Sequence, residues 1–196
     1  SLVRLGLDRV DVLLLHDPEK FDLDIADEDA YPALISLREE GLVGSVGIGS
    51  MSVQALARAS TTPGLDVLMI AGRLTLAEQL DDVLPVAAAN GMQVVAAGVF
   101  NSGLLATNSP SGDARYEYGA VPPERLARVR AIALVCSQFG VDLPTAALQY
   151  TLRLAPVCSV VVGSGRPEQV IENASRMRLP VPEELWLQLA EANLIQ

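Results

Sequence analysis

The sequence predicts an α/β protein built on a parallel sheet. Five apolar runs of strand length alternate with segments of helical patterning, and these runs cover residues 10–16, 43–50, 65–71, 93–99 and 157–162. A β-then-α order repeated without long intervening coil requires parallel strands joined by right-handed crossovers. Polar residues follow each run, and the carboxyl ends of parallel strands are where ligands and chemistry collect in such folds.

The first run, Val10 to Pro18, contains His16, the single histidine of the chain. A continuous apolar run of this length, closed by a proline, predicts a strand buried on both faces. His16 would stand at the carboxyl end of that strand, which makes it a candidate catalytic group. The alternative is that His16 merely hydrogen-bonds the following turn.

The segments between the runs predict helices with recognisable ends. Ser52 is a good N-cap, and Gly41 and Gly140 each stand where a helix should stop. The expected helices cover 29–40, 52–60, 77–90, 122–139, 144–154, 167–177 and 182–193. Residues 1–6 have the pattern of the last turn of a helix, so we expect the fold to be incomplete at this end.

Residues 106–122 form a polar loop rich in Ser, Gly, Asn and Pro. A loop of this length favours a lid or binding loop over a simple connection. Tyr116 and Tyr118 are placed to reach a substrate from it. The alternative is that both are surface aromatics.

The composition limits the partners and the compartment. Fourteen basic and twenty-four acidic residues give a net charge of −10, which argues against nucleic acid as a partner. Cys136 and Cys158 lie in apolar surroundings without a CxxC or Cys/His cluster, which predicts buried free thiols and no metal site. The amino terminus lacks the order of a signal peptide, and the apolar stretch 83–100 is interrupted by Pro85 and Gly91, so we expect a cytosolic protein without a membrane span.

The stretch from Gly163 to Asn173 predicts an anion site. Its glycines expose backbone N–H groups beside the amino terminus of a helix, and Arg166 adds a full positive charge. The alternative is an ordinary strand, turn and helix with Pro167 at the first helical position. The stretch does not match GxGxxG, and the sole lysine, Lys20, is not in a Walker motif, so a Rossmann or P-loop interpretation is weak.

Two architectures fit the five units: a complete five-stranded doubly wound sheet, or part of an eight-stranded (β/α) barrel, which normally needs roughly 250 residues. Polar residues at the end of every strand suit a barrel mouth better than a single switch point, and these are His16, Ser50, Arg73, Asn101 with Ser102, and Ser164 with Arg166. The residues alone thus favour the barrel slightly.

Four blocks of the sequence together resemble the aldo-keto reductases: Arg4 to Pro18, Leu37 to Gly49, Asn101 to Ala106 and Gly163 to Asn173. The resemblance covers nearly the whole chain. Ala71 to Leu76 and Val99 to Ala106 are most similar to the branch of L-fucose, D-threo-aldose and other aldose 1-dehydrogenases. The resemblance implies a (β/α)8 barrel that binds NAD(P) without a Rossmann fold. It also implies that residues 1–196 form a single domain that covers about strands 4–8 of the barrel, with strands 1–3 absent.

The resemblance also implies roles for individual residues. His16 matches the histidine that orients the substrate oxygen, and Ser50 would hold the nicotinamide carboxamide. The pyrophosphate would be covered by Phe100, Asn101, Ser102, Gly103 and Leu104. The adenosine half would be held by Gly163, Ser164, Gly165, Arg166, Gln169, Glu172 and Asn173.

Three catalytic groups of the family have no counterpart here. Its aspartate, tyrosine and lysine lie on the first three strands, and none of Tyr31, Tyr116, Tyr118 or Tyr150 stands at the family's position. The resemblance therefore implies an oxidoreductase that moves hydride between NAD(P) and an aldose or small carbonyl or alcohol, and it implies that this chain is inactive because three catalytic residues are missing. Gln169 stands where many NADPH-dependent members carry an arginine, which favours NAD over NADP, although Arg166 weakens this inference.

Two other interpretations remain open. One is a non-catalytic nucleotide-binding or interaction protein that retains the dinucleotide site, and the other is an unrelated flavodoxin-like protein. Exposed sheet edges in a partial barrel would also favour self-association.

Overall fold

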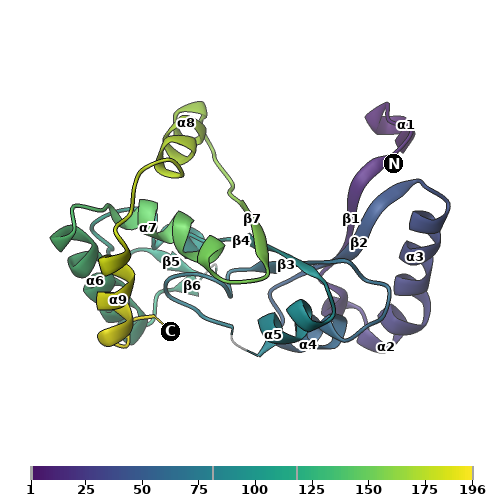
Figure 1. Ribbon diagram of the computed structural model, residues 1–196, viewed down its shortest axis with the longest axis horizontal. Helices are drawn as coiled ribbons and strands as arrows, with labels where there is room; N and C mark the ends of the chain where they lie inside the picture. The colour runs from purple at the N-terminus through teal and green to yellow at the C-terminus, as the bar shows by residue number, and fades with distance from the viewer. Residues whose placement is uncertain (1, 81, 118, 196) are drawn as a thin grey trace. The chain divides into compact units, whose positions relative to one another are not determined.

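The computed structural model describes residues 2–80, 82–117 and 119–195 (Figure 1). One sheet has the strand order β1-β2-β3-β4-β7, and β5 and β6 form a separate two-stranded sheet. The chain divides into two compact units, of which unit 1 comprises Ser1–Ala71, Leu80–Val95 and Ala155–Cys158, and unit 2 comprises Gly72–Gln79, Ala96–Leu154 and Ser159–Gln196.

Unit 1 contains three complete strands and most of the amino-terminal helices. The strands are β1 (Val10–His16), β2 (Val43–Ser50) and β3 (Val67–Ala71), and β2 pairs in parallel with both neighbours. The helical segments are α1 (Leu2–Leu5), η1 (Pro18–Lys20), α2 (Leu23–Ile25), the π-helical η2 (Ala26–Ala30), α3 (Tyr31–Glu39), α4 (Val53–Ser60) and α5 (Val83–Ala89).

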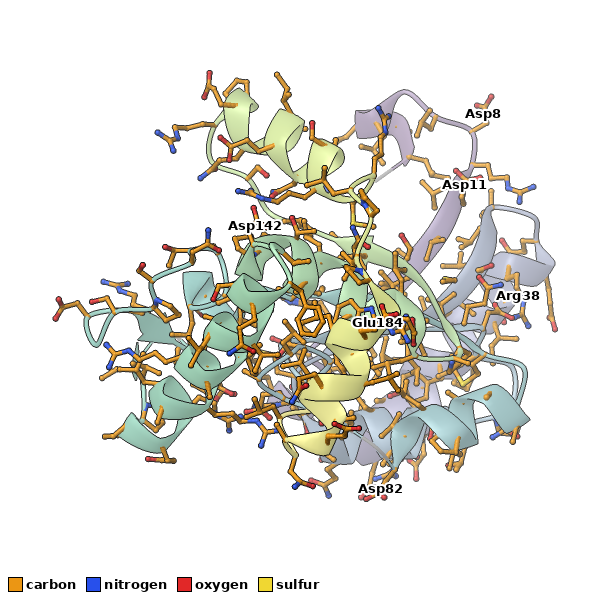
Figure 2. All side chains as sticks on the ribbon, turned by 60° about the vertical axis from the view of Figure 1, so that its left-hand side comes forward. Asp8, Asp11, Arg38, Asp82, Asp142 and Glu184 are labelled. Atoms are coloured by element: carbon orange, nitrogen blue, oxygen red, sulfur yellow. The ribbon has the colours of Figure 1, made fainter. Side chains whose placement is uncertain are left out.

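The core of unit 1 lies where α3 and α4 pack on β2 and β3. Ile48, Leu56, Leu68 and Ile70 are fully buried there. Arg38 at the end of α3, labelled in Figure 2, donates to Asp66 just before β3 at 2.5 Å, and Asp66 accepts from the Val46 N–H of β2 at 2.9 Å. This carboxylate thus ties one helix to two strands.

The prediction that residues 10–16 are buried on both faces was wrong. β1 stands at the end of the strand order, and Val12 is 49% exposed. The helix before it, α1, buries none of its described residues. Because neither a further strand nor a packed helix covers β1 within the described part of the chain, an apolar run alone overestimates its burial.

Unit 2 is built around helices. Strands β4 (Gln93–Ala97) and β7 (Val157–Val161) end in it, and it contains η3 (Asn101–Gly103), β5 (Arg115–Tyr116), β6 (Gly119–Ala120), α6 (Pro123–Gln138), α7 (Leu143–Tyr150), η4 (Thr151–Arg153), α8 (Pro167–Arg176) and α9 (Glu183–Glu191). Ile132, Leu143 and Trp186 are among the residues of its core, where α6 contacts both α7 and α9.

Three expectations fail in and beside unit 2. The helix expected over 77–90 begins only at Val83, because Thr75 Oγ1 accepts from the N–H groups of Ala77 and Glu78 and closes a turn there. Tyr116 is neither a surface aromatic nor free for a substrate: it is buried and donates to Glu78. Tyr118 lies outside the described residues. Cys136 is buried as predicted, but Cys158 is exposed on β7, the strand at the far end of the sheet order.

Across the described residues, no single helix is long and apolar enough to cross a membrane. One bent pair, Pro123–Gln138 with Leu143–Arg153, meets a test of length and composition, with a bend of 102° between its parts. Both of these helices bury side chains in the core of unit 2.

Candidate functional site

His16 and Ser50 lie at the carboxyl ends of neighbouring strands in unit 1. β1 and β2 run parallel, and His16 is in register with Gly49, the residue before Ser50. The His16 side chain is 86% exposed, and its Nε2 lies 3.6 Å from Asp17 Oδ2. The imidazole is therefore open to a ligand, and its contact with Asp17 is longer than a hydrogen bond.

Ser50, in contrast, is buried and hydrogen-bonded. Its hydroxyl lies 2.8 Å from both carboxylate oxygens of Glu19, to which it donates, and it accepts from the Ser52 N–H at 2.9 Å. The residue as a whole is 1% exposed. A ligand carbonyl that accepts from this hydroxyl would have to displace Glu19.

Unit 2 contains a hollow of about 520 Å³ between the segment after β4 and the segment that runs from β7 into α8. It brings together eight of the predicted cofactor residues: Phe100, Ser102, Gly103, Gly163, Gly165, Gln169, Glu172 and Asn173. These residues come from two parts of the sequence about sixty positions apart, and the fold brings them to one hollow.

The backbone around the hollow is accessible. An added Cβ at Gly103 or at Gly163 would meet no described atom within 4 Å, and Gly103 has a φ of +100°, which favours glycine. The Gly165 N–H donates to Gln169 Oε1 at 2.8 Å. One backbone donor of the predicted anion site is thus already bonded by a side chain of α8.

Five of the predicted cofactor residues lie outside the hollow: Ser50, described above, and Asn101, Leu104, Ser164 and Arg166. Asn101 and Leu104 are buried, and the Asn101 amide donates to the Gly72 carbonyl at 3.2 Å. Ser164 and Arg166 line a neighbouring surface depression, together with Val170 and Ile171. The structure therefore gives Asn101 and Leu104 packing contacts and places Arg166 at the N-cap of α8, beside the hollow.

Arg176 is the charged residue of the hollow that sequence reasoning missed. Its Nη1 lies 3.4 Å from Glu172 Oε2 and 3.4 Å from Asn173 Oδ1, and its Nε lies 3.4 Å from Asp142 Oδ2. The spacing of Glu172 and Arg176, four positions apart on a helix, was the available signal. No sequence signal indicated the contact with Asp142, which lies 34 positions earlier.

Asp142 lies at the amino end of α7, where Figure 2 labels it, and its carboxylate accepts from the Thr145 N–H at 2.7 Å. Burial by itself would raise the pKa of this carboxyl. The hydrogen bonds with Thr145 and the nearby Arg176 guanidinium outweigh burial and lower the pKa below its ordinary value. Asp142 is therefore a stable anion beside Arg176.

The hollow offers groups suited to the phosphate and ribose portion of a dinucleotide. Open glycine backbone admits a close approach by phosphate, and amide and carboxylate side chains on α8 can accept from and donate to hydroxyls and a purine. Among the residues that the structure describes, no group of three or more His, Cys, Asp or Glu side chains could hold a metal ion.

Polar residues and a hollow large enough for a ligand lie at the carboxyl ends of the strands. These features are typical of a ligand-binding α/β protein. Comparison with known proteins gives the family. The aldo/keto reductase family matches residues 1–194, and the chain belongs to this family. The resemblance read from the sequence is thereby confirmed, and with it the (β/α)8 barrel as the fold of the family.

Two curated relatives fall in the dehydrogenase part of the family. The chain is 53% identical over 197 residues to D-threo-aldose 1-dehydrogenase from Pseudomonas sp, and 32% identical over 206 residues to pyridoxal 4-dehydrogenase from Microbacterium luteolum. Both matches cover 100% of this chain and 60% of the relative. The first agrees with the aldose dehydrogenase branch predicted from the sequence.

Among solved structures, aldo-keto reductase AKR11C1 from Bacillus halodurans, in its holo form, has a similar fold. The TM-score is 0.78 at 21% identity, and the match covers 100% of this chain and 64% of that one. This chain therefore spans about three fifths of the length of the relatives that it matches.

Proposed function

We propose that this chain forms the carboxyl-terminal part of an aldo-keto reductase barrel, as a single domain over residues 1–196. Strands β1, β2, β3, β4 and β7 would correspond to strands 4–8 of the barrel. Two observations support this: the sheet order is sequential through both units, and the strands at its two ends, β1 and β7, carry exposed side chains. Covering strands from the rest of a barrel would bury them.

The function supported best is NAD(P)-dependent oxidoreduction, with hydride passing between the nicotinamide and an aldose or a small carbonyl or alcohol. The observation that carries this proposal is the hollow in unit 2, which gathers eight of the predicted cofactor residues. The dehydrogenases at 53% and 32% identity support the substrate class.

Each site residue has a proposed task. His16, exposed at the end of β1, would orient the substrate oxygen, and Ser50 would hold the carboxamide once Glu19 moves away. Phe100 to Leu104 would cover the pyrophosphate, with Asn101 and Leu104 acting through the packing of that segment. Gly163 to Arg166, with Gln169, Glu172 and Asn173, would receive the adenosine half. The bound nicotinamide supplies the hydride acceptor or donor.

We propose further that the chain by itself does not catalyse the reaction. A catalytic tyrosine must exchange a proton near neutral pH. Burial, followed by the charge of Asp27, raises the pKa of Tyr31 to about 12, and burial and the hydrogen bond with Glu78 raise the pKa of Tyr116 well above its ordinary value. Tyr150 packs against Trp186 in the core. None of these phenols is suited to the task.

Cofactor titration of the protein, in the form that its native source produces, tests the proposal. We expect NAD to bind more tightly than NADP because Gln169 carries no charge to pair with a 2′-phosphate. Turnover of aldoses with NAD would establish the dehydrogenase. Binding without turnover would instead favour the non-catalytic nucleotide-binding protein, and failure of both dinucleotides to bind would refute the proposed site.

The intact mass of the native protein separates these cases further. A mass well above 20.8 kDa would leave room for the strands that carry the aspartate, tyrosine and lysine. A mass close to 20.8 kDa would make binding without chemistry the better description.

A further inference from the structure

Helix α8 carries three of the predicted adenosine-site residues, yet little apolar packing holds it in place. None of its ten residues, all of which the structure describes, is buried, and Val170 and Ile171 are more than half exposed. Its position must therefore depend strongly on polar contacts.

The polar contacts of α8 converge on its last turn and on α7. Gln149 Nε2 in α7 donates to the carbonyl oxygens of Arg176, at 2.7 Å, and of Leu179, at 2.9 Å. The Arg176 side chain adds the ion pair with Asp142 at the amino end of α7. Arg176 is thus held through both its main chain and its side chain.

From Arg176 the contacts continue to the wall of the hollow. The same Nη1 approaches Glu172 and Asn173, and the Asn173 amide in turn lies 3.5 Å from Ser164 Oγ in the loop after β7. Asp142, Arg176, Asn173 and Ser164 therefore form a continuous polar chain from the start of α7 to the predicted phosphate loop.

The exposure and contacts of Arg176 favour a role in orienting its neighbours over a role limited to stabilising helix α8. Its side chain is 23% exposed, against 59% for Glu172. An arginine and a glutamate four positions apart stabilise an exposed helix only weakly. Asp142 contacts the Nε atom of Arg176, whereas Glu172 and Asn173 contact its Nη1 atom. The contact with Asp142 therefore restrains the guanidinium group that Glu172 and Asn173 contact.

We propose that Arg176, anchored by Asp142, is a positioning residue that sets Glu172 and Asn173 for the adenosine end of a nicotinamide dinucleotide. This inference rests on the proposed function. It assigns Arg176 and Asp142 a role through other side chains, without requiring either of them to touch the cofactor.

The test is calorimetric titration of the full native protein with ADP-ribose, which carries the adenosine end but no nicotinamide. We expect Arg176→Met to weaken binding about tenfold, equivalent to about 1.4 kcal/mol. Arg176→Lys, which keeps one charge, should recover part of the loss. Arg178→Met, which removes an arginine just after α8 and outside the hollow, is the matched control and should bind as the wild type does.

Asp142→Asn tests the anchor, because asparagine can still cap α7. We expect this change to weaken ADP-ribose binding about threefold in the wild type and not at all in the Arg176→Met background, because both changes interrupt one chain of contacts. If the native protein turns over, Arg176→Met should raise the KM for NAD while leaving kcat within about twofold, a split that general unfolding would not produce.

The outcomes separate the two claims. Wild-type protein that does not bind ADP-ribose refutes the proposed function and this inference with it. Wild-type binding that Arg176→Met leaves unchanged refutes the inference alone. A loss that appears only with ligands bearing a 2′-phosphate would show direct contact by Arg176, and it would also overturn the positioning role.

Discussion

The carboxylate of Asp142 should make the stability of the protein sensitive to acid. Its pKa is lowered in the folded state, so the stabilisation is complete above the unfolded value of about 4 and is lost as the pH falls through the folded pKa. We expect the urea midpoint of the wild type to fall further between about pH 6 and pH 3 than that of Asp142→Asn. Identical pH profiles for the two proteins would contradict this assignment.

The hydroxyl of Tyr31 should contribute nothing to stability. It is buried without a hydrogen-bond partner among the described residues. We expect Tyr31→Phe to leave the free energy of unfolding unchanged or to raise it by up to about 1 kcal/mol. Tyr116→Phe is the matched control: it removes the hydrogen bond with Glu78 and should lower the free energy of unfolding by about 1 to 2 kcal/mol in the same urea titration. Comparable losses for both variants would show that Tyr31 has a partner.

At this scale the sequence identified local chemistry well and distant contacts poorly. Gln169, Glu172 and Asn173 could be predicted to lie together, because their spacing is that of one helix face. The engagement of Ser50 by Glu19, 31 positions earlier, could not, since it depends on how η1 folds back over the end of β2. Arg176 was missed for the same reason on its Asp142 side.

Gly47 of strand β2 leaves no room for a side chain against β3. A Cβ on Gly47 would lie 1.7 Å from the Val67 carbonyl oxygen of β3, whereas a Cβ on Gly49 would meet its nearest atom, Met69 Cβ, at 3.7 Å. We expect Gly47→Ala to lower the free energy of unfolding by at least about 3 kcal/mol, because β2 and β3 must separate. Gly49→Ala should cost less than about 1 kcal/mol. Equal denaturation midpoints would contradict this close approach.

Most boundaries of helices and strands could be predicted because the spacing of apolar residues changes sharply at them. β1 and β2 have the predicted limits, and α8 ends one residue earlier than expected. The prediction for 77–90 was wrong, since apolar residues at 76–80 pack as a turn that Thr75 caps. The hairpin of β5 and β6 was also missed, because two-residue strands carry no alternating pattern.

At the scale of the whole molecule, the two end strands should govern association. Unpaired strand edges with apolar side chains favour edge-to-edge contact. We expect the 196-residue chain on its own to give a mass well above 20.8 kDa in light scattering. Val12→Lys, on the exposed side of β1, should reduce the association, whereas Leu134→Lys, on the exposed side of α6, should not. A monodisperse monomer of the unaltered chain would overturn the prediction.

The degree of burial of the two end strands, β1 and β7, could not be predicted from sequence patterns. The apolar runs 10–16 and 157–162 have the composition of strands covered on both sides, and both are partly exposed. The composition of a strand indicates which environment suits it. Whether the strand is buried depends on other segments that pack against it. The family could still be recognised, because its motifs are spread along the chain.

The hydrogen bond from Gly165 N–H to Gln169 Oε1 also bears on how fast a ligand can enter. The side-chain oxygen of Gln169 accepts from this N–H, which is one of the donors of the proposed anion site. An exposed side chain changes rotamer within nanoseconds, far sooner than a ligand at cellular concentration arrives. For an anion that binds at the proposed site, the departure of Gln169 would therefore not slow association, and the contacts of the anion itself would set its residence time.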